Sequence, residues 1–204
     1  MQILEELTVT PKEAIKVELE IAVLSEATQV IVENHYLKRG RTMAQIAYWI
    51  NYQQARVGVL LFALPRMSVR TDKFNNWSPM EIIELARLWI DPSIQERKVM
   101  DSNFRVHSLP IASMAIGSAL KRISDDWSSK YPHLPVIKGC VAWSDDVFHQ
   151  GTIYRASNFK LVGKSGGSLH GQRQRTNGGR DKMHNDYKNP KSAFLYEFRC
   201  IEKV

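Results

Sequence analysis

Two short stretches of the chain carry side chains that could take part in proton transfer or metal binding. The first holds His35 and Tyr36, and the second holds Asp145, His149 and Tyr154. A neutral imidazole and a carboxylate can ligate a metal ion, and a phenol can donate a proton to a leaving group. Each residue also has a structural interpretation. His35 can cap helix carbonyl groups, Asp145 and His149 can form a turn and its cap, and Tyr154 can be a core residue.

Hydrophobic periodicity predicts the elements that position these residues. A helix capped by Ser25 is expected to carry His35 and Tyr36 near its end, and a buried strand is expected to precede Asp145. The predicted fold class is α/β, with a central mixed, mostly antiparallel sheet flanked by helices. The predicted elements are a strand at 15–24, a helix at 27–38, two strands within 43–64 that turn near Gln53 and Gln54, a short capped helix at 78–81, a strand at 84–90, a helix at 110–127, a strand at 135–143, a helix or turn at 149–157, and strands at 158–163 and 194–201.

Length and composition favour one soluble domain over residues 1–204. Two cysteines, Cys140 and Cys200, do not form a disulfide framework, and a reducing compartment is the simpler interpretation. The chain lacks both a signal-peptide pattern and the roughly 18–20 apolar residues that span a bilayer. We therefore expect a cytoplasmic protein, in the host cytoplasm if a phage encodes it, with no membrane partner. The oligomeric state is open, and a homodimer is compatible with the sequence.

The net positive charge is concentrated in one segment. The chain has a formal charge of +7, and residues 164–191 hold seven Lys or Arg against two Asp, which gives +5. The glycines of this segment favour a loop insertion, and such a basic loop suits the phosphate backbone of DNA. A solvated insertion without a function is the alternative. The DNA-contact candidates are Lys164, Arg173, Arg175, Arg180 and Lys182.

Four segments resemble the phage DNA-modification family called Mom. They are NHYLKRG at 34–40, ELARLWI at 84–90, SMAIGSALK at 113–121 and WSDDVFHQGTIYRASNFKLVGKS at 143–165. The order of elements is also similar to the acyl-CoA-dependent acetyltransferase fold, GNAT. The resemblance implies an enzyme that places a carbamoylmethyl group on N6 of adenine in phage DNA and so protects the DNA from host restriction. It also implies that His35, Tyr36, Asp145 and Tyr154 are catalytic.

The resemblance further implies iron(II) and a relation to acyl-CoA users. His35, Asp145 and His149 could supply two imidazoles and one carboxylate to iron, with Asp146 as a competing carboxylate. The usual pyrophosphate-binding loop of GNAT enzymes is missing before the clearest helix, so the use of acyl-CoA is open. The candidates for cofactor binding are Arg87, Leu88, Trp89, Ile90, Ser113 and Gly117.

Two other functions remain open at this point. One is an acyl-CoA-dependent N-acetyltransferase that acts on an amine of a small molecule or protein, and the other is a DNA-binding accessory protein. Trp77, in the polar loop KFNNWSP, is the best tryptophan for stacking on a base. Gly117 would permit the close approach of a cofactor, although helix packing would also explain it. Arg87 interrupts an apolar strand, so it is expected to bind an anion or to form a salt bridge, for example with Glu84.

Overall fold

The computed structural model describes residues 15–38, 40–41, 43–65, 74–101, 103, 105–165 and 189–198. A sheet of seven strands in the order β1-β2-β3-β4-β7-β9-β8 forms its centre. Only β4 and β7 pair in parallel among these neighbours, which confirms the predicted mixed, mostly antiparallel sheet. The sheet strands are β1 (Val17–Ile21), β2 (Ala44–Tyr52), β3 (Ala55–Ala63), β4 (Ile82–Ile90), β7 (Gly139–Asp145), β8 (Lys160–Ser165) and β9 (Lys191–Glu197).

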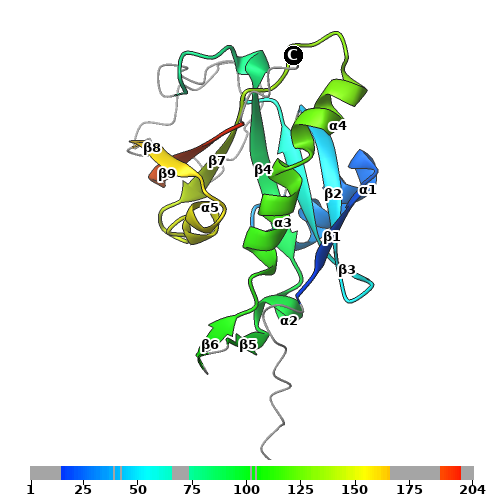
Figure 1. Cartoon of the computed structure of the whole chain (residues 1–204), viewed down its shortest axis with the longest axis vertical. Coiled ribbons are helices and arrows are strands. Elements are labelled where there is room, and N and C mark those ends of the chain that lie inside the picture. The colour runs from blue at the N-terminus through cyan, green and yellow to red at the C-terminus, as the bar shows by residue number, and fades with distance from the viewer. Residues whose placement is uncertain are drawn as a thin grey trace, which may run out of the picture.

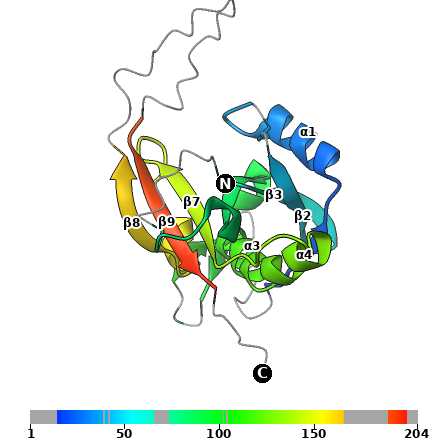
Figure 2. The same cartoon turned by 90° about the horizontal axis from the view of Figure 1, so that it is seen from above.

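Helices cover both faces of this sheet (Figure 2). On one face, α1 buries Ala27 and Ile31 against residues of β2 and β3 such as Trp49. On the other face, α3 and α4 bury Ile116 and Trp127 in the largest core cluster. The helices are α1 (Leu24–Asn34), α2 (Pro92–Gln95), α3 (Ile111–Leu120), α4 (Ile123–Lys130) and α5 (Thr152–Ala156), with a 3-10 helix at Pro79–Glu81. None of the helices in the described parts of the chain is long and apolar enough to cross a membrane.

Two local predictions from the sequence are confirmed. Gln53 and Gln54 both have positive φ angles, 50° and 64°, and join β2 to β3. Two consecutive positive φ angles are typical of the tight hairpin turn whose twist matches that of paired strands. Ser78 and Glu81 form the predicted capping box. The Ser78 side chain accepts a hydrogen bond from a backbone N–H of the first turn, and the Glu81 side chain accepts one from the Ser78 N–H. This turn sets the start of β4.

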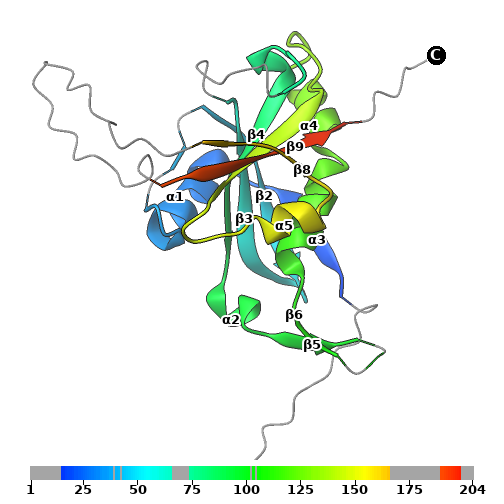
Figure 3. The same cartoon turned by 90° about the vertical axis from the view of Figure 1, so that its left-hand side faces the viewer.

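The parallel pairing of β4 with β7 covers only the first part of β4. It runs from Ile82–Gly139 to Leu85–Ala142, whereas β4 continues along β3 to Ile90. A register shift between β3 and β4 falls at Ala86, where β4 leaves β7. Beyond this point β7 stays with β9 and β8, and these strands diverge from β4 (Figure 1). In Figure 3, β8 and β9 cross the molecule at a steep angle to β2 and β3.

Several predicted boundaries were wrong. α1 begins at Leu24 without a side-chain cap and ends at Asn34, so His35 lies just after the helix and not within it. The predicted helix at 110–127 is two helices that meet at Lys121 and Arg122, because Arg122 leaves helical geometry and donates to the Leu19 carbonyl oxygen of β1 at 3.1 Å. The last strand starts at Lys191 rather than 194. The sequence did not reveal α2 or the hairpin of β5 (Lys98–Met100) and β6 (Val106–Ser108).

Candidate active site

His35 is the residue at which the chain leaves α1. Its backbone N–H still donates to Ile31 O at 2.9 Å, but its ψ of 143° is extended. The side chain is buried, and its Nδ1 accepts a hydrogen bond from the Leu37 N–H at 3.1 Å. A neutral imidazole that accepts at Nδ1 carries its proton on Nε2, and we infer this tautomer from the hydrogen bond. His35 therefore offers an N–H donor to its surroundings.

The charge of His35 is suppressed by its environment. Burial, the largest cause, together with the nearby Arg87 and His149 side chains lowers its pKa from 6.5 to about 4. At neutral pH the imidazole is uncharged. Tyr36 stacks on it with ring centroids 4.4 Å apart. Burial raises the pKa of the Tyr36 phenol, as does the negative charge of Asp145, whereas Arg87 lowers it.

A buried ion pair fixes the loop that carries His35 and Tyr36. Nη2 of Arg41, six residues after His35, lies 2.5 Å from Oε2 of Glu84 on β4, and both side chains are 11% exposed. The loop after α1 is thereby attached to the middle of the sheet. The sequence analysis did not single out Arg41, because nothing in its local pattern indicates a partner on β4.

Asp145 ends β7 and organises the turn that follows. Its backbone oxygen accepts from the N–H groups of Phe148 and His149 at 3.0 and 2.8 Å. Its carboxylate accepts from the Val147 N–H at 3.2 Å, and Nδ2 of Asn189 lies 3.0 Å from both carboxylate oxygens. The neighbouring Asp146 binds Ser144 and Ser192 instead. Asp145 is therefore the carboxylate that belongs to the 145–149 turn, and Asp146 connects β7 to β9.

The two segments predicted from the sequence meet in space. The Tyr36 ring lies 5.8 Å from the Phe148 ring and 5.9 Å from the His149 ring, measured between centroids. Burial and, to a smaller extent, the negative charge of Asp145 raise the pKa of Tyr36. The end of α1 and the turn after β7 thus line one site.

Tyr154 approaches the same site from α5. Its ring packs against Phe194 and Phe159, with centroids 5.3 and 5.7 Å away. Burial raises the pKa of its phenol well above the ordinary value, Tyr36, Cys140 and Glu84 raise it further, and Arg87 lowers it. Tyr154 therefore remains protonated at every physiological pH, which is the state that a proton donor needs.

Gly151 allows α5 to start close to β9. Its φ is 69°, and an added Cβ would lie 2.3 Å from Cζ of Phe194. A residue with a side chain would be strained here both by the backbone conformation and by the contact. Packing therefore explains why a glycine stands at this position, and the close approach of α5 to β9 places Tyr154 against Phe194.

The predicted cofactor residues of β4 lie where the strand leaves β7. Arg87 is half-buried and donates from Nη1 to the Ala86 carbonyl at 2.6 Å. Its charge affects the pKa values of His35, Tyr36 and Tyr154, so it belongs to the same site. Leu88 packs against the core on the α3 side, Trp89 packs against the α1 side, and Ile90 is buried.

Ser113 and Gly117 on α3 have different surroundings. Ser113 donates from Oγ to the Pro110 carbonyl at 3.1 Å, and its own carbonyl accepts from Oγ of Ser157 at 3.3 Å, which joins α3 to the end of α5. A Cβ added at Gly117 would have nothing within 4 Å. Close helix packing, one of the two explanations for this glycine, is therefore wrong, and the space above it is open.

The predicted iron ligands do not assemble here. Across the described ranges, no three His, Cys, Asp or Glu side chains form a group that could hold a metal ion. Both oxygens of Asp145 accept from the Asn189 amide, and Nδ1 of His35 accepts from a backbone N–H. Ligation by Nε2 would require the other tautomer and the loss of the Leu37 hydrogen bond. These donor atoms do not fit iron in this arrangement.

Most of the basic segment lies outside the described residues, and so do the predicted DNA contacts Arg173, Arg175, Arg180 and Lys182. Its first candidate, Lys164, is exposed on β8 opposite Ser192. The segment starts and ends beside the site: Ser165 pairs with Lys191, and Lys191 pairs with Asp145. Asn189, at the end of the segment, is the residue that binds the Asp145 carboxylate.

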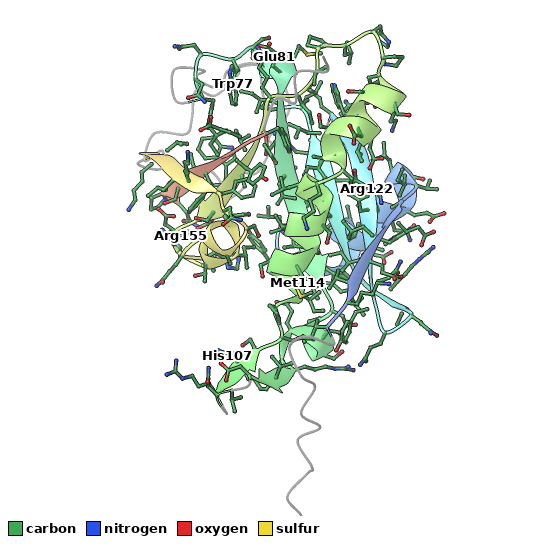
Figure 4. All side chains as sticks on the ribbon, viewed as in Figure 1. Trp77, Glu81, His107, Met114, Arg122 and Arg155 are labelled. Atoms are coloured by element: carbon green, nitrogen blue, oxygen red, sulfur yellow. The ribbon has the colours of Figure 1, made fainter. Side chains whose placement is uncertain are left out.

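Trp77 is not a free stacking platform, contrary to the prediction. It is half-buried, packs on the core cluster of Val141 and Leu195, and occupies the space that a side chain at Gly139 would need. Figure 4 shows it near Glu81, at the end of the molecule where β4 begins, whereas the candidate site lies toward the other end of β4.

Polar residues before α3 form contacts within the β5–β6 hairpin. Nε2 of His107 lies 2.9 Å from Oδ2 of Asp101, and Lys98 donates to Oγ of Ser108 at 3.1 Å. Figure 4 shows His107 on this hairpin, at the opposite end of the molecule from Trp77. The hairpin therefore does not bring His107 to the site.

Solved structures identify the class of fold. A ribosomal-protein α-N-acetyltransferase, RimL, in complex with coenzyme A superposes with a TM-score of 0.50 at 13% identity, over 89% of this chain and 94% of that chain. An acetyltransferase from Salmonella typhimurium that modifies the N-terminal serine of a ribosomal protein gives 0.48 at 16% identity, over 89% and 95% of the two chains. A Bacillus subtilis acetyltransferase in complex with CoA gives 0.48 at 10% identity, over 90% and 99%. The fold is that of the GNAT acetyltransferases.

The sequence identifies the family within this class. The model of the Mom protein family matches residues 16–199, and the chain belongs to that family. No curated protein matches the chain at a significant level.

Proposed function

We propose that this protein is a DNA modification enzyme that transfers a carbamoylmethyl-type group to N6 of adenine and so protects phage DNA from host restriction. Membership of the Mom family supports a modification role. The observation that carries the proposal is the meeting of the His35–Tyr36 loop with the 145–149 turn, beside the phenol of Tyr154.

The charge states of these side chains suit a transfer to an amine. A new bond from N6 to the transferred carbon requires that N6 lose a proton and that the leaving group accept one. The protonated phenol of Tyr154 is suited to donate to the leaving group. The carboxylate of Asp145 is the acceptor that we assign for the N6 proton. His35 is uncharged and donates from Nε2, so its role is to orient a polar atom of the substrate.

The donor site that we propose lies along β4 beyond Ala86. There β7 has separated from β4, so a ligand can run along the strand edge between β4 and α3. Gly117 of α3 leaves open space. RimL and other proteins of this fold were solved with coenzyme A bound. An acyl-CoA is therefore the donor class that we propose for the residues of β4 and α3. Transfer of its acyl group breaks the thioester C–S bond and gives N6-acyladenine, so a carbamoylmethyl product requires a donor that carries its leaving group on the CH2 carbon.

DNA is the proposed acceptor because of charge and position. Most of the net charge of +7 is contributed by residues 164–191, whose two ends lie beside Asp145. Adenine N6 is paired inside a duplex, so the base must be extruded or single-stranded before it can react. We treat the chain as one domain with this basic insertion. Iron has no step in the proposal, because the residues described do not gather a ligand set.

Nucleoside analysis tests the proposal. DNA incubated with the protein, acyl-CoA and iron(II) is digested to nucleosides, and mass spectrometry measures the adenine product. Wild type is expected to yield a heavier deoxyadenosine, and Tyr154→Phe is expected to lower the yield at least about 100-fold, the size of a general-acid contribution. Tyr196→Phe is the matched control, because Tyr196 packs against Phe159 as Tyr154 does but has no role in the proposed transfer. Unmodified adenine throughout contradicts the proposal.

The divergence of β4 from β7 also supports a second function, an acyl-CoA-dependent N-acetyltransferase acting on a small-molecule or protein amine. This function requires the donor site but no DNA. It predicts tight binding of acetyl-CoA together with DNA binding that is equally weak in wild type and in variants of the basic segment. Calorimetric titration with each ligand separates the two functions.

A further inference from the structure

The surface of the site carries aromatic rings that no part of the chain covers among the residues described. Phe148 is 63% exposed and Tyr36 is 52% exposed, and their rings are in contact. His149 meets the edge of the same Tyr36 ring, and Val147 beside them is also exposed. A cluster of exposed aromatic residues at a polar site is unusual, because burying such rings is favourable.

Phe148 is held in this position by a rigid turn. The backbone N–H groups of residues 147, 148 and 149 all donate to Asp145, the first to its carboxylate and the others to its carbonyl oxygen. The Asn189 amide then holds the carboxylate. A flexible loop would let Phe148 fold onto the protein, but this turn keeps the ring at the surface. The exposed ring is thus a built feature of the turn.

The Tyr36 ring is also held in place, by contacts on one of its faces. One face of its ring stacks on His35 at 4.4 Å, and His35 is itself buried and hydrogen-bonded. The loop is attached to β4 through Arg41. Two aromatic rings from segments over a hundred residues apart are therefore preorganised side by side.

The ring geometry decides how a flat ligand would bind. A third ring between two others needs centroids about 7 Å apart, since each contact takes about 3.5 Å. Tyr36 and Phe148 are 5.8 Å apart and tilted by 48°, so nothing fits between them. A flat ligand would instead lie on their outer surface. The pair is a platform and not a clamp.

We propose that Tyr36 and Phe148 form a stacking platform for the purine ring of an unpaired adenine in DNA, an inference that rests on the proposed function. The charge argues for a nucleic-acid base rather than an apolar peptide. The segment that supplies +5 of the charge of +7 begins and ends at strand positions paired beside Asp145, the residue that builds the turn. Phosphates held there would bring an extruded base onto the rings.

Stacking predicts a specific loss. The probe is a single strand of abasic sites with one central 2-aminopurine, whose fluorescence falls when it stacks, compared with the same strand in which the central position is also abasic. Phe148→Leu keeps an apolar side chain but removes the aromatic face. It is expected to weaken binding of the base-containing strand about 5- to 100-fold and to leave binding of the abasic strand unchanged. Phe148→Tyr is expected to retain both binding and quenching.

Leu161→Ala is the control, because Leu161 is an exposed apolar residue on β8 outside the platform. It should alter neither strand's affinity. Equal binding of the two strands by wild type, or no change in Phe148→Leu, overturns the platform.

The nucleoside assay separates this failure from that of the function. If wild type modifies adenine and Phe148→Leu has an unchanged KM for DNA, the platform is wrong and the proposed function stands. If wild type binds the base-containing strand more tightly, Phe148→Leu abolishes this difference, and wild type modifies no adenine, the proposed function is wrong and the base-binding site stands.

Discussion

The side-chain amide of Asn189 bridges both carboxylate oxygens of Asp145, at 3.0 Å each, across 44 residues of sequence. Asp145 is thereby oriented by a residue that lies two positions before the start of β9. A hydrogen bond to a charged group contributes about 1.5–3 kcal/mol when it is well made. The orientation of the proposed proton acceptor thus depends on a residue at the end of the basic segment.

Loss of this amide is expected to reduce activity more than stability. In Asn189→Ala the Asp145 carboxylate loses its side-chain donor and keeps only the Val147 N–H, so kcat/KM for adenine modification is expected to fall about 10- to 100-fold. Asn189→Asp places a second carboxylate against the first and is expected to reduce it further. Steady-state kinetics by nucleoside mass spectrometry measures both.

Ser192→Ala is the matched control for Asn189. The Ser192 hydroxyl binds Asp146 at 3.0 Å, the neighbouring carboxylate that connects β7 and β9. Its removal is expected to cost about 1 kcal/mol of stability and to leave kcat/KM near that of wild type. If Ser192→Ala is the more damaging change for activity, Asp146 and not Asp145 is the functional carboxylate.

The Arg41–Glu84 pair is expected to be important for stability. Both side chains are 11% exposed, and breaking such a pair leaves a buried charge poorly compensated. Arg41→Ala should lower the free energy of unfolding by about 3 kcal/mol in urea denaturation. Arg56→Ala removes an exposed pair with Glu20, in which each side chain is 54% exposed, and should cost about 1 kcal/mol or less. Equal losses in the two variants would contradict the buried role of Arg41.

The lowered pKa of His35 predicts a pH dependence of stability with a definite sign. The unfolded chain protonates this imidazole below about pH 6.5, whereas the folded protein keeps it neutral until about pH 4. The contribution of neutral His35 is therefore complete above pH 6.5 and is lost as the pH falls toward 4. His35→Gln lacks this titration, so its stability should decline less over that interval.

Two measurements check this prediction for His35. Urea denaturation of wild type and His35→Gln between pH 7 and pH 4 gives the difference in unfolding free energy. The NMR signal that disappears in His35→Gln should titrate near pH 4. A midpoint near 6.5 would mean that the imidazole is not buried as the structure has it.

Local patterns in the sequence were sufficient for most of the sheet. The alternation on both sides of Gln53 and Gln54 predicted the β2–β3 hairpin, and the Ser78–Glu81 box predicted the turn before β4. The break between α3 and α4 was missed because Arg122 forms a hydrogen bond with a strand about a hundred residues earlier. Periodicity describes one helix face and contains no such distant partner.

Some residues of the candidate site could likewise be predicted from local sequence, and others could not. Segments that resemble the Mom family indicated His35, Tyr36, Asp145 and Tyr154. Arg41 and Asn189 could not be found, since their partners lie 43 and 44 residues away and neither residue stands in a distinctive motif. The importance of Phe148 depends on its exposure, which becomes visible only when the turn after β7 is folded.

Gly117 gives a prediction in which stability and activity change in opposite directions. It lies within α3, and an added Cβ would meet nothing within 4 Å. Gly117→Ala should therefore raise the free energy of unfolding by about 1 kcal/mol, because alanine favours the helix. If the space above Gly117 receives the acyl donor, as we propose, the same methyl group should raise KM for that donor.

Gly151→Ala provides the contrast for this experiment. Gly151 has a φ of 69°, and a Cβ there would lie 2.3 Å from the Phe194 ring. Alanine should lower the free energy of unfolding by about 1–3 kcal/mol through backbone strain and crowding. Thermal denaturation of both variants, followed by titration with acetyl-CoA, makes the comparison. A stabilised Gly117→Ala protein with an unchanged KM would exclude α3 at this position from the donor site, because the added methyl group would then have met no ligand.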